Sequence, residues 1–170
     1  MSAVERAPKR VSTRQRGLTS RERPLGDVLE FMQALWAVAH GLESTSKRMQ
    51  ETLGVTGPQR LVLRLIGHFE QLSPGELAEL LHVHPSSLTG VLRRLEAGTF
   101  VKRKRDPKDG RRAILTLTSL GLRLNTRDAG TVEEAVRRAL ATAGVEQIGA
   151  EREVLSALAA ELGVETRSPE

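Results

Sequence analysis

Residues 73–118 carry the pattern that most restricts the fold of this 170-residue chain. Ser73, Pro74 and Glu76 combine a helix N-cap, a proline in the first helical position and a capping-box glutamate, which together predict the start of a helix. A second helix is predicted from Pro85, with apolar residues recurring at helical spacing. Two β-segments, about 100–105 and 112–118, then follow, separated by Asp-Pro and Asp-Gly turn signals. This order predicts a helix-turn-helix followed by a β-hairpin, or wing.

The remaining pattern is helical. Apolar residues recur every three to four positions from Pro24 to about Leu53, and again over about 58–69. Beyond the wing, one helix is predicted over about 119–143 and another over about 147–162, with Gly130 and Gly144 weakening the stretch. The second wing strand is expected to alternate Ala113, Leu115 and Leu117 inward with Arg112, Ile114 and Thr116 outward. The predicted fold class is mainly α with a small β-wing.

Positive charge is confined to two regions. Residues 1–23 carry a net charge of +5 and residues 93–112 a net charge of +6, whereas the rest of the chain is acidic, at −6. A localised basic surface on an acidic body is typical of a protein that binds phosphates of nucleic acid. The basic tail at 1–23 has two interpretations: a flexible solvated segment, or an arm that lies along DNA.

Several protein classes do not fit the composition. The chain has no cysteine, which excludes disulfides, thiolate metal sites and cysteine-based peroxide sensing. No apolar run approaches the ~20 residues of a membrane span. We therefore expect no membrane partner, and we expect the protein to be cytoplasmic. No phosphate-binding glycine loop and no carboxylates clustered with a histidine base are present, so we expect neither an enzyme nor a cofactor.

The helix from Pro85 is the candidate DNA-reading element. Its small hydroxyl side chains would let it approach base edges, and Gly90 leaves room for the backbone. The alternative is an ordinary solvated helix face. The candidate contacts on this helix are Ser86, Ser87, Thr89 and Arg93. Arg94 is a further candidate with two alternatives, because it would hold either a DNA phosphate or a carboxylate within the protein.

The wing supplies a second set of candidates. Arg111 at the hairpin tip is expected to enter a minor groove, oriented by Asp109, since narrow A·T tracts attract guanidinium groups. The other wing cations would meet phosphates and carry no sequence information, and alternation along the strands leaves about half of them facing solvent. They are Lys102, Arg103, Lys104, Arg105, Lys108 and Arg112.

These motifs resemble the multiple-antibiotic-resistance-regulator (MarR) family of bacterial winged helix-turn-helix transcription factors. The run 109–121 is similar to the family's wing signature, an Asp-x-Arg followed by Leu-Thr and then a glycine. Residues 77–81 and 92–96 resemble its paired DNA-reading helices. Two departures stand out: this chain has Thr99-Phe100 where family members usually carry Gly-Leu, and Arg93 where an acidic or smaller residue is common.

The resemblance implies a homodimer on a pseudo-palindromic double-stranded DNA operator, at a bacterial nucleoid. A first helix of about 30 residues also needs a partner to cover its apolar stripe. The expected interface is Leu25, Val28, Leu29, Met32, Leu35, Leu155, Leu158 and Leu162. The expected segments are a basic flexible tail (1–23), a first dimerisation helix (24–57), the winged helix-turn-helix domain (58–118), C-terminal dimerisation helices (119–163) and a short tail (164–170).

The resemblance further implies a small effector, often an aromatic acid, between the helices near the DNA-binding lobe. Candidate pocket residues are Trp36, His40, Arg60, Arg64 and His68, with a packed tryptophan and solvated arginines as the alternative. His82 and His84 are too few donors for a metal site, and His84 is instead a candidate N-cap. The function expected is a repressor released by a small ligand; the alternatives are an effector-independent architectural DNA-binding protein or co-regulator, and a protein-interaction module.

Overall fold

The computed structural model describes residues 25–69 and 71–164. The predicted basic tail and the last six residues lie outside the described part. The chain divides into two units, 1–37 and 38–170, and the boundary falls within the first helix. The elements are α1 (Asp27–Leu53), α2 (Gly57–His68), α3 (Pro74–Leu80), α4 (Pro85–Ala97), β1 (Val101–Arg105), β2 (Ala113–Leu117), α5 (Ser119–Asn125), α6 (Val132–Leu140) and α7 (Val145–Glu161).

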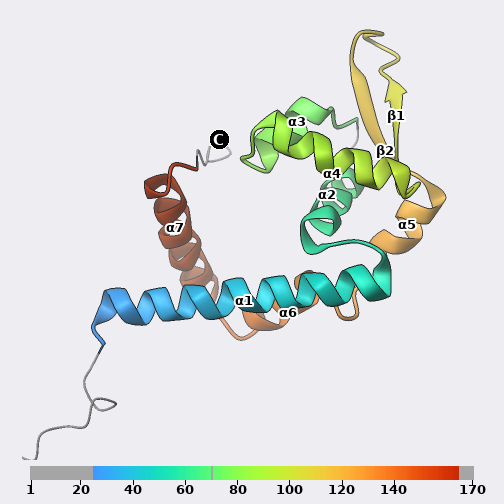
Figure 1. Cartoon of the computed structure of the whole chain (residues 1–170). Helices are drawn as coiled ribbons and strands as arrows, with labels where there is room; N and C mark the ends of the chain where they lie inside the picture. The colour runs from blue at the N-terminus through green and yellow to red at the C-terminus, as the bar shows by residue number, and fades with distance from the viewer. Residues whose placement is uncertain (1–24, 70, 165–170) are drawn as a thin grey trace, which may run out of the picture. The chain divides into compact units, whose positions relative to one another are not determined.

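The expected fold class is confirmed: the described chain is mostly helical, with a two-stranded antiparallel sheet. Strands β1 and β2 pair in a register that runs from Val101 opposite Leu117 to Arg105 opposite Ala113. Figure 1 shows this hairpin projecting from the helices beside it. The amide of Leu115 also donates to the carbonyl of Leu72 at 2.8 Å, which ties the wing to the segment before α3.

The apolar core lies inside the helix-turn-helix and wing. Side chains from α2, α3, α4, β1, β2 and α5 form one buried cluster, whose most enclosed members are Leu63, Leu77, Leu92, Leu95 and Leu115. Burial of several leucines, each contributing roughly 1.5–3 kcal/mol, fixes α4 on this core by one face. The opposite face of α4 is left exposed.

Local capping signals place the helix starts. The Ser73–Glu76 capping box forms, as predicted, and His84 is the N-cap of α4 through its Nδ1. A second capping box, between Thr56 and Gln59, begins α2. These caps satisfy amide groups that would otherwise lack a partner in the first turn.

Two expectations about the chain beyond α4 were wrong. Ile114 is buried rather than outward-facing, so both faces of β2 are covered near this position. The helix expected over 119–143 ends at Asn125, and α6 begins only after the Thr131 N-cap. Gly130 adopts a positive φ of 75° in this break, a conformation that glycine adopts without steric cost.

Helices α1 and α7 carry the largest exposed apolar side chains. In the first unit Val28 and Trp36 of α1 are 73% and 79% exposed, and in the second unit Val145 of α7 is 87% exposed. No residue of α7 is buried. Among the described residues, no helix has both the length and the apolar character required to cross a bilayer.

Candidate nucleic-acid interface and adjoining cavity

The exposed face of α4 carries the residues expected to read DNA. Ser86, Ser87, Thr89, Arg93 and Arg94 are all exposed, whereas the opposite face is buried in the core. A Cβ added at position 90 would meet no protein atom within 4 Å, so the glycine leaves open space on this face. A surface of small polar groups and two cations can approach an approximately flat partner closely.

Two of the hydroxyl groups have partners within the protein. The Ser86 hydroxyl lies 2.7 Å from His84 Nδ1, and the Thr89 hydroxyl donates to the carbonyl of Pro85 at 2.9 Å. His84 therefore both caps α4 and orients Ser86. The Thr89 hydroxyl keeps its acceptor lone pairs, because it uses only its proton in the bond to Pro85.

The wing cations separate into paired and unpaired groups. Arg103 pairs with Glu96 of α4 at 2.5 Å. Arg112 pairs with Glu76 at 2.5 Å and with the buried Asp106 at 3.5 Å. In the other basic residues of α4 and the wing, the charged side-chain group forms no hydrogen bond or ion pair with a described residue. They are Arg93, Arg94, Lys102, Lys104, Arg105, Lys108 and Arg111.

Arg112 and Asp106 join the two wing strands where the loop of the hairpin begins. The Asp106 carboxylate accepts from the amide of Lys108 at 2.8 Å and pairs with Arg112, whose guanidinium also reaches the carbonyl of Gln71. Arg112 was expected to bind phosphate, but its donors are occupied inside the protein. The sequence indicated Asp106 only as part of a turn, and it gave no sign that Arg112 would also pair with Glu76, which lies 36 residues earlier in the chain.

The wing tip follows the sequence expectation. Asp109 Oδ1 accepts from the amide of Arg111 at 3.0 Å, so the carboxylate orders the backbone at that position. The Arg111 side chain itself is exposed. This arrangement presents one guanidinium at the end of the hairpin.

The five residues expected to form an effector pocket do not line one cavity. Arg60 is fully buried and donates to the carbonyls of Leu124, Asn125 and Arg127, and to Glu133 at 2.7 Å. Arg64 donates to the carbonyl of Asn125 at 2.7 Å, while His40, His68 and Trp36 are exposed, the last in the first unit. Arg60 therefore caps the C-terminal end of α5, where backbone carbonyls lack helical partners.

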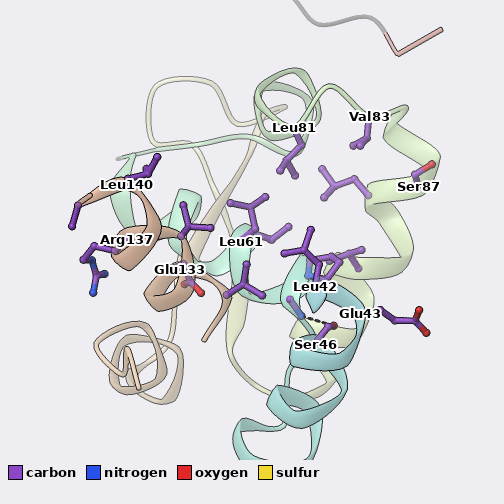
Figure 2. A pocket seen from close by; sticks show the side chains of 18 residues that line it. Leu42, Glu43, Ser46, Leu61, Leu81, Val83, Ser87, Glu133, Arg137 and Leu140 are labelled. Carbon is purple, nitrogen blue, oxygen red and sulfur yellow. Dashed lines mark hydrogen bonds between the residues drawn. The ribbon is translucent and has the colours of Figure 1, made fainter. Parts of the chain in front are cut away.

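A cavity of about 1270 Å³ instead opens between α1, α2, α4 and α6 of the second unit. Its walls are predominantly apolar, as Figure 2 shows, and Ser87 of α4 lies at its edge. The sequence could not reveal this cavity, because its walls come from elements up to a hundred residues apart. Its apolar wall includes Leu42, Leu61, Val83, Leu88, Val136 and Leu140.

Among the described residues, no group of three or more histidine, aspartate or glutamate side chains could hold a metal ion. His82 and His84 stand before α4, where His84 acts as the N-cap.

The fold and this surface define a winged helix-turn-helix protein. The model of the MarR family matches residues 53–112. The HTH-type transcriptional regulator TtmR of Methylorubrum extorquens is 33% identical over 103 residues, which are 61% of this chain and 53% of TtmR. An HTH-type transcriptional repressor of Mycobacterium tuberculosis is 37% identical over 89 residues, 52% of this chain and 64% of the repressor. Over residues 53–112 the chain is thus similar to the MarR family.

A solved structure supports the same fold. Staphylococcus aureus MepR, in a complex with DNA, aligns with a TM-score of 0.64 at 19% identity, covering 78% of this chain and 97% of that one. At this identity the likeness shows the fold alone. The chain spans between about half and two thirds of the length of the curated relatives that it matches, and those relatives are transcriptional regulators.

Proposed function

We propose that this chain is a sequence-specific, double-stranded-DNA-binding transcriptional regulator that acts as a homodimeric repressor and is released by a small ligand. The observation that carries the proposal is the exposure of the polar face of α4 and of the unpaired wing cations on one folded module. A helix of this kind fits a major groove, and a basic hairpin beside it fits the neighbouring phosphates and minor groove. The repressors among the relatives support the sign of regulation.

The homodimer is supported by apolar surface that a single chain leaves uncovered. Six of the eight expected interface residues lie on α1 and α7, the other two lie next to an end of these helices, and six of the eight are more than half exposed. Exposed apolar patches of this kind mark interfaces. A two-fold dimer would bind a pseudo-palindromic operator with half-sites ~34–36 Å apart.

Release by a ligand is supported by the cavity. It is bordered by α4, which would read DNA, and by α6, which belongs to the expected dimerisation region. An occupant that prefers one arrangement of these elements would shift the population of DNA-binding states.

The DNA proposal is tested by selecting bound fragments from randomised and genomic DNA with the full chain. We expect a recovered inverted repeat, with affinity that falls ~10³–10⁵-fold between 50 and 200 mM salt if 6–10 phosphates are contacted. Binding without dependence on salt would favour the protein-interaction reading. A recovered DNA without symmetry or sequence preference would favour an architectural protein.

Arg111→Ala tests the wing tip on the recovered operator. We expect a loss of about 1–3 kcal/mol in binding free energy, because a minor-groove guanidinium is removed, and no change in the unfolding transition. Arg138→Ala is the control, since it removes an exposed guanidinium from α6, outside the α4 face and the wing. Equal effects of the two substitutions in fluorescence anisotropy would contradict the assigned role of Arg111.

A further inference from the structure

Two hydroxyl groups on the exposed face of α4 use their protons in bonds within the protein. His84 Nδ1 accepts from the amide of Ser86, so this ring nitrogen carries no proton of its own. The Ser86 hydroxyl lies 2.7 Å from the same nitrogen and is therefore the donor in that bond. The Thr89 hydroxyl donates to the carbonyl of Pro85 at 2.9 Å. Because a hydroxyl has a single proton, neither group has one left for a partner.

The acceptor side of both oxygen atoms remains available. A hydroxyl oxygen has two lone pairs, and donation of the proton leaves both of them free. Ser86 and Thr89 are exposed, and Gly90 beside them adds no side chain that would keep a partner away. The face of α4 therefore presents two oxygen atoms that accept hydrogen bonds and that can donate only by giving up a bond within the protein.

The hydrogen-bonding groups of DNA divide by the same criterion. Phosphate oxygens, guanine O6 and N7, adenine N7 and thymine O4 only accept hydrogen bonds. In the major groove the donors are the N6 amino group of adenine and the N4 amino group of cytosine. An oxygen whose proton is committed gains a bond only from such an amino group, and a base acceptor placed against it loses its bonds to water without compensation.

We propose that Ser86 and Thr89 determine specificity by accepting hydrogen bonds from the exocyclic amino groups of adenine or cytosine in a major groove. His84 is the positioning residue that keeps Ser86 an acceptor. The inference rests on the proposed function, because it names the base chemistry that the same face of α4 reads. It also assigns phosphate binding to the cations of α4 and the wing, since a phosphate requires a donor.

The test uses the DNA recovered by the selection described above and changes one base at a time, with affinity measured by fluorescence anisotropy. Purine in place of adenine, and 2-pyrimidinone in place of cytosine, lack only the amino group, whereas guanine and thymine place an acceptor there. At two positions of a half-site we expect removal of the amino group to weaken binding about three- to tenfold. The acceptor-bearing base should weaken binding at least about tenfold at these positions.

Variants of the two hydroxyl residues connect each position with its acceptor. Ser86→Ala should reduce the cost of amino removal to less than about twofold at one position, and Thr89→Val should do so at the other, because the acceptor is gone. Thr89→Ser is the matched control, since it keeps the hydroxyl that bonds to Pro85, and it should retain the full cost. The substituted residues are exposed, and circular dichroism checks that each variant is folded.

Two substitutions of His84 separate its role as a cap from its effect on Ser86. Asparagine and glycine are both accepted at an N-cap, so α4 should keep its start in His84→Asn and in His84→Gly. Only asparagine offers the Ser86 hydroxyl an acceptor. His84→Asn should retain discrimination against guanine and thymine at the position read by Ser86. In His84→Gly the freed proton can donate to these bases, so the discrimination should fall to within about threefold.

An amino-group effect that persists unchanged in Ser86→Ala and Thr89→Val would overturn the proposal, as would equal discrimination by His84→Asn and His84→Gly. Recovered DNA in which no amino group matters would also overturn it, while an inverted repeat in that DNA would leave the regulator in place. A selection that recovers no preferred sequence would reject the sequence-specific regulator and this inference together.

Discussion

Thr99 adopts a backbone conformation that usually belongs to glycine. Its φ is +58°, while the preceding Gly98 has an ordinary φ of −74°. Thr99 stands where the resembled family usually carries glycine, and in this chain the glycine is displaced by one position, to Gly98. The structure gives the displaced glycine a second role, because a Cβ at position 98 would lie 2.7 Å from the ring of Phe100.

Thr99→Gly should therefore stabilise the fold. A left-handed conformation costs a non-glycine residue about 1–2 kcal/mol, and the extra unfolded-state entropy of glycine returns about 0.5–1 kcal/mol, so we expect a net gain of roughly 0.5–1 kcal/mol. Urea unfolding measures the change. Gly98→Ala is the companion variant and should destabilise by roughly 1–3 kcal/mol through overpacking against Phe100. A loss of stability in Thr99→Gly would refute the argument from strain.

Gly121 illustrates a residue whose identity is set by a close approach. A Cβ at this position would overlap the backbone carbonyl of Phe100, so α5 can pack against the start of the wing only with glycine here. The family signature contains a glycine at this place. The physical requirement behind it appears only when the helix and the strand are seen together.

At the scale of an element, the capping box of α3 also anchors the wing. The pKa of Glu76 is lowered mainly by a hydrogen bond from the Ser73 amide. The Ser73 hydroxyl and the pairing with Arg112 lower it further, in that order. The ionised carboxylate is thus favoured by folding. Its stabilisation is present above the unfolded-state pKa and disappears as the pH falls through the lowered folded-state pKa.

Glu76→Gln should accordingly destabilise the chain at pH 7 by a few tenths to about 1 kcal/mol, an amount limited by the partial exposure of the pair. The difference from the unmodified chain should shrink as the pH falls below the ordinary glutamate pKa of 4.5 and through the lowered pKa of Glu76 in the folded state. Thermal unfolding across pH 2.5–7 measures it. Glu79→Gln is the control for this comparison, because it removes a carboxylate from the same helix outside the capping box. A pH-independent difference for Glu76→Gln would argue against the carboxylate's role.

The break between α5 and α6 is the element-scale feature with the widest consequences. Thr131 caps α6, Gly130 permits the turn, and Arg60 satisfies the carbonyls that α5 leaves open. A continuous helix would have left the buried guanidinium without these acceptors. The break thus follows from where α2 places one cation.

At the scale of the whole molecule, the open question is what covers the apolar surfaces of α1 and α7. The proposed dimer predicts that Leu155→Asp separates the two chains without unfolding either, because Leu155 is 53% exposed in a single chain. Two-fold symmetry places the substitution in the interface twice. Each lost leucine contact is worth roughly 1.5–3 kcal/mol, so we expect the dissociation constant to rise at least about 10²-fold.

Leu122→Asp is the matched control, since Leu122 is 54% exposed on α5, which packs against α2 and β2, and is not one of the eight residues expected at the interface. Sedimentation velocity over a range of concentrations, with circular dichroism to check folding, distinguishes the two variants. A dimer that survives Leu155→Asp would reject α7 as part of the interface.

Local signals in the sequence determined the helix starts, the two wing strands and the exposed face of α4. Ser73, His84 and Thr118 cap helices within three residues of themselves, and turn chemistry acts over similar distances, so these features need no knowledge of the rest of the fold. Only the tertiary structure decided which cations are internal, where the helix after the wing breaks, and where a cavity opens. The charged groups of Arg60, Arg112 and Glu133 pair with residues many positions away in the chain. Whether such a charge can be buried depends on these distant partners and not on its neighbours in the sequence.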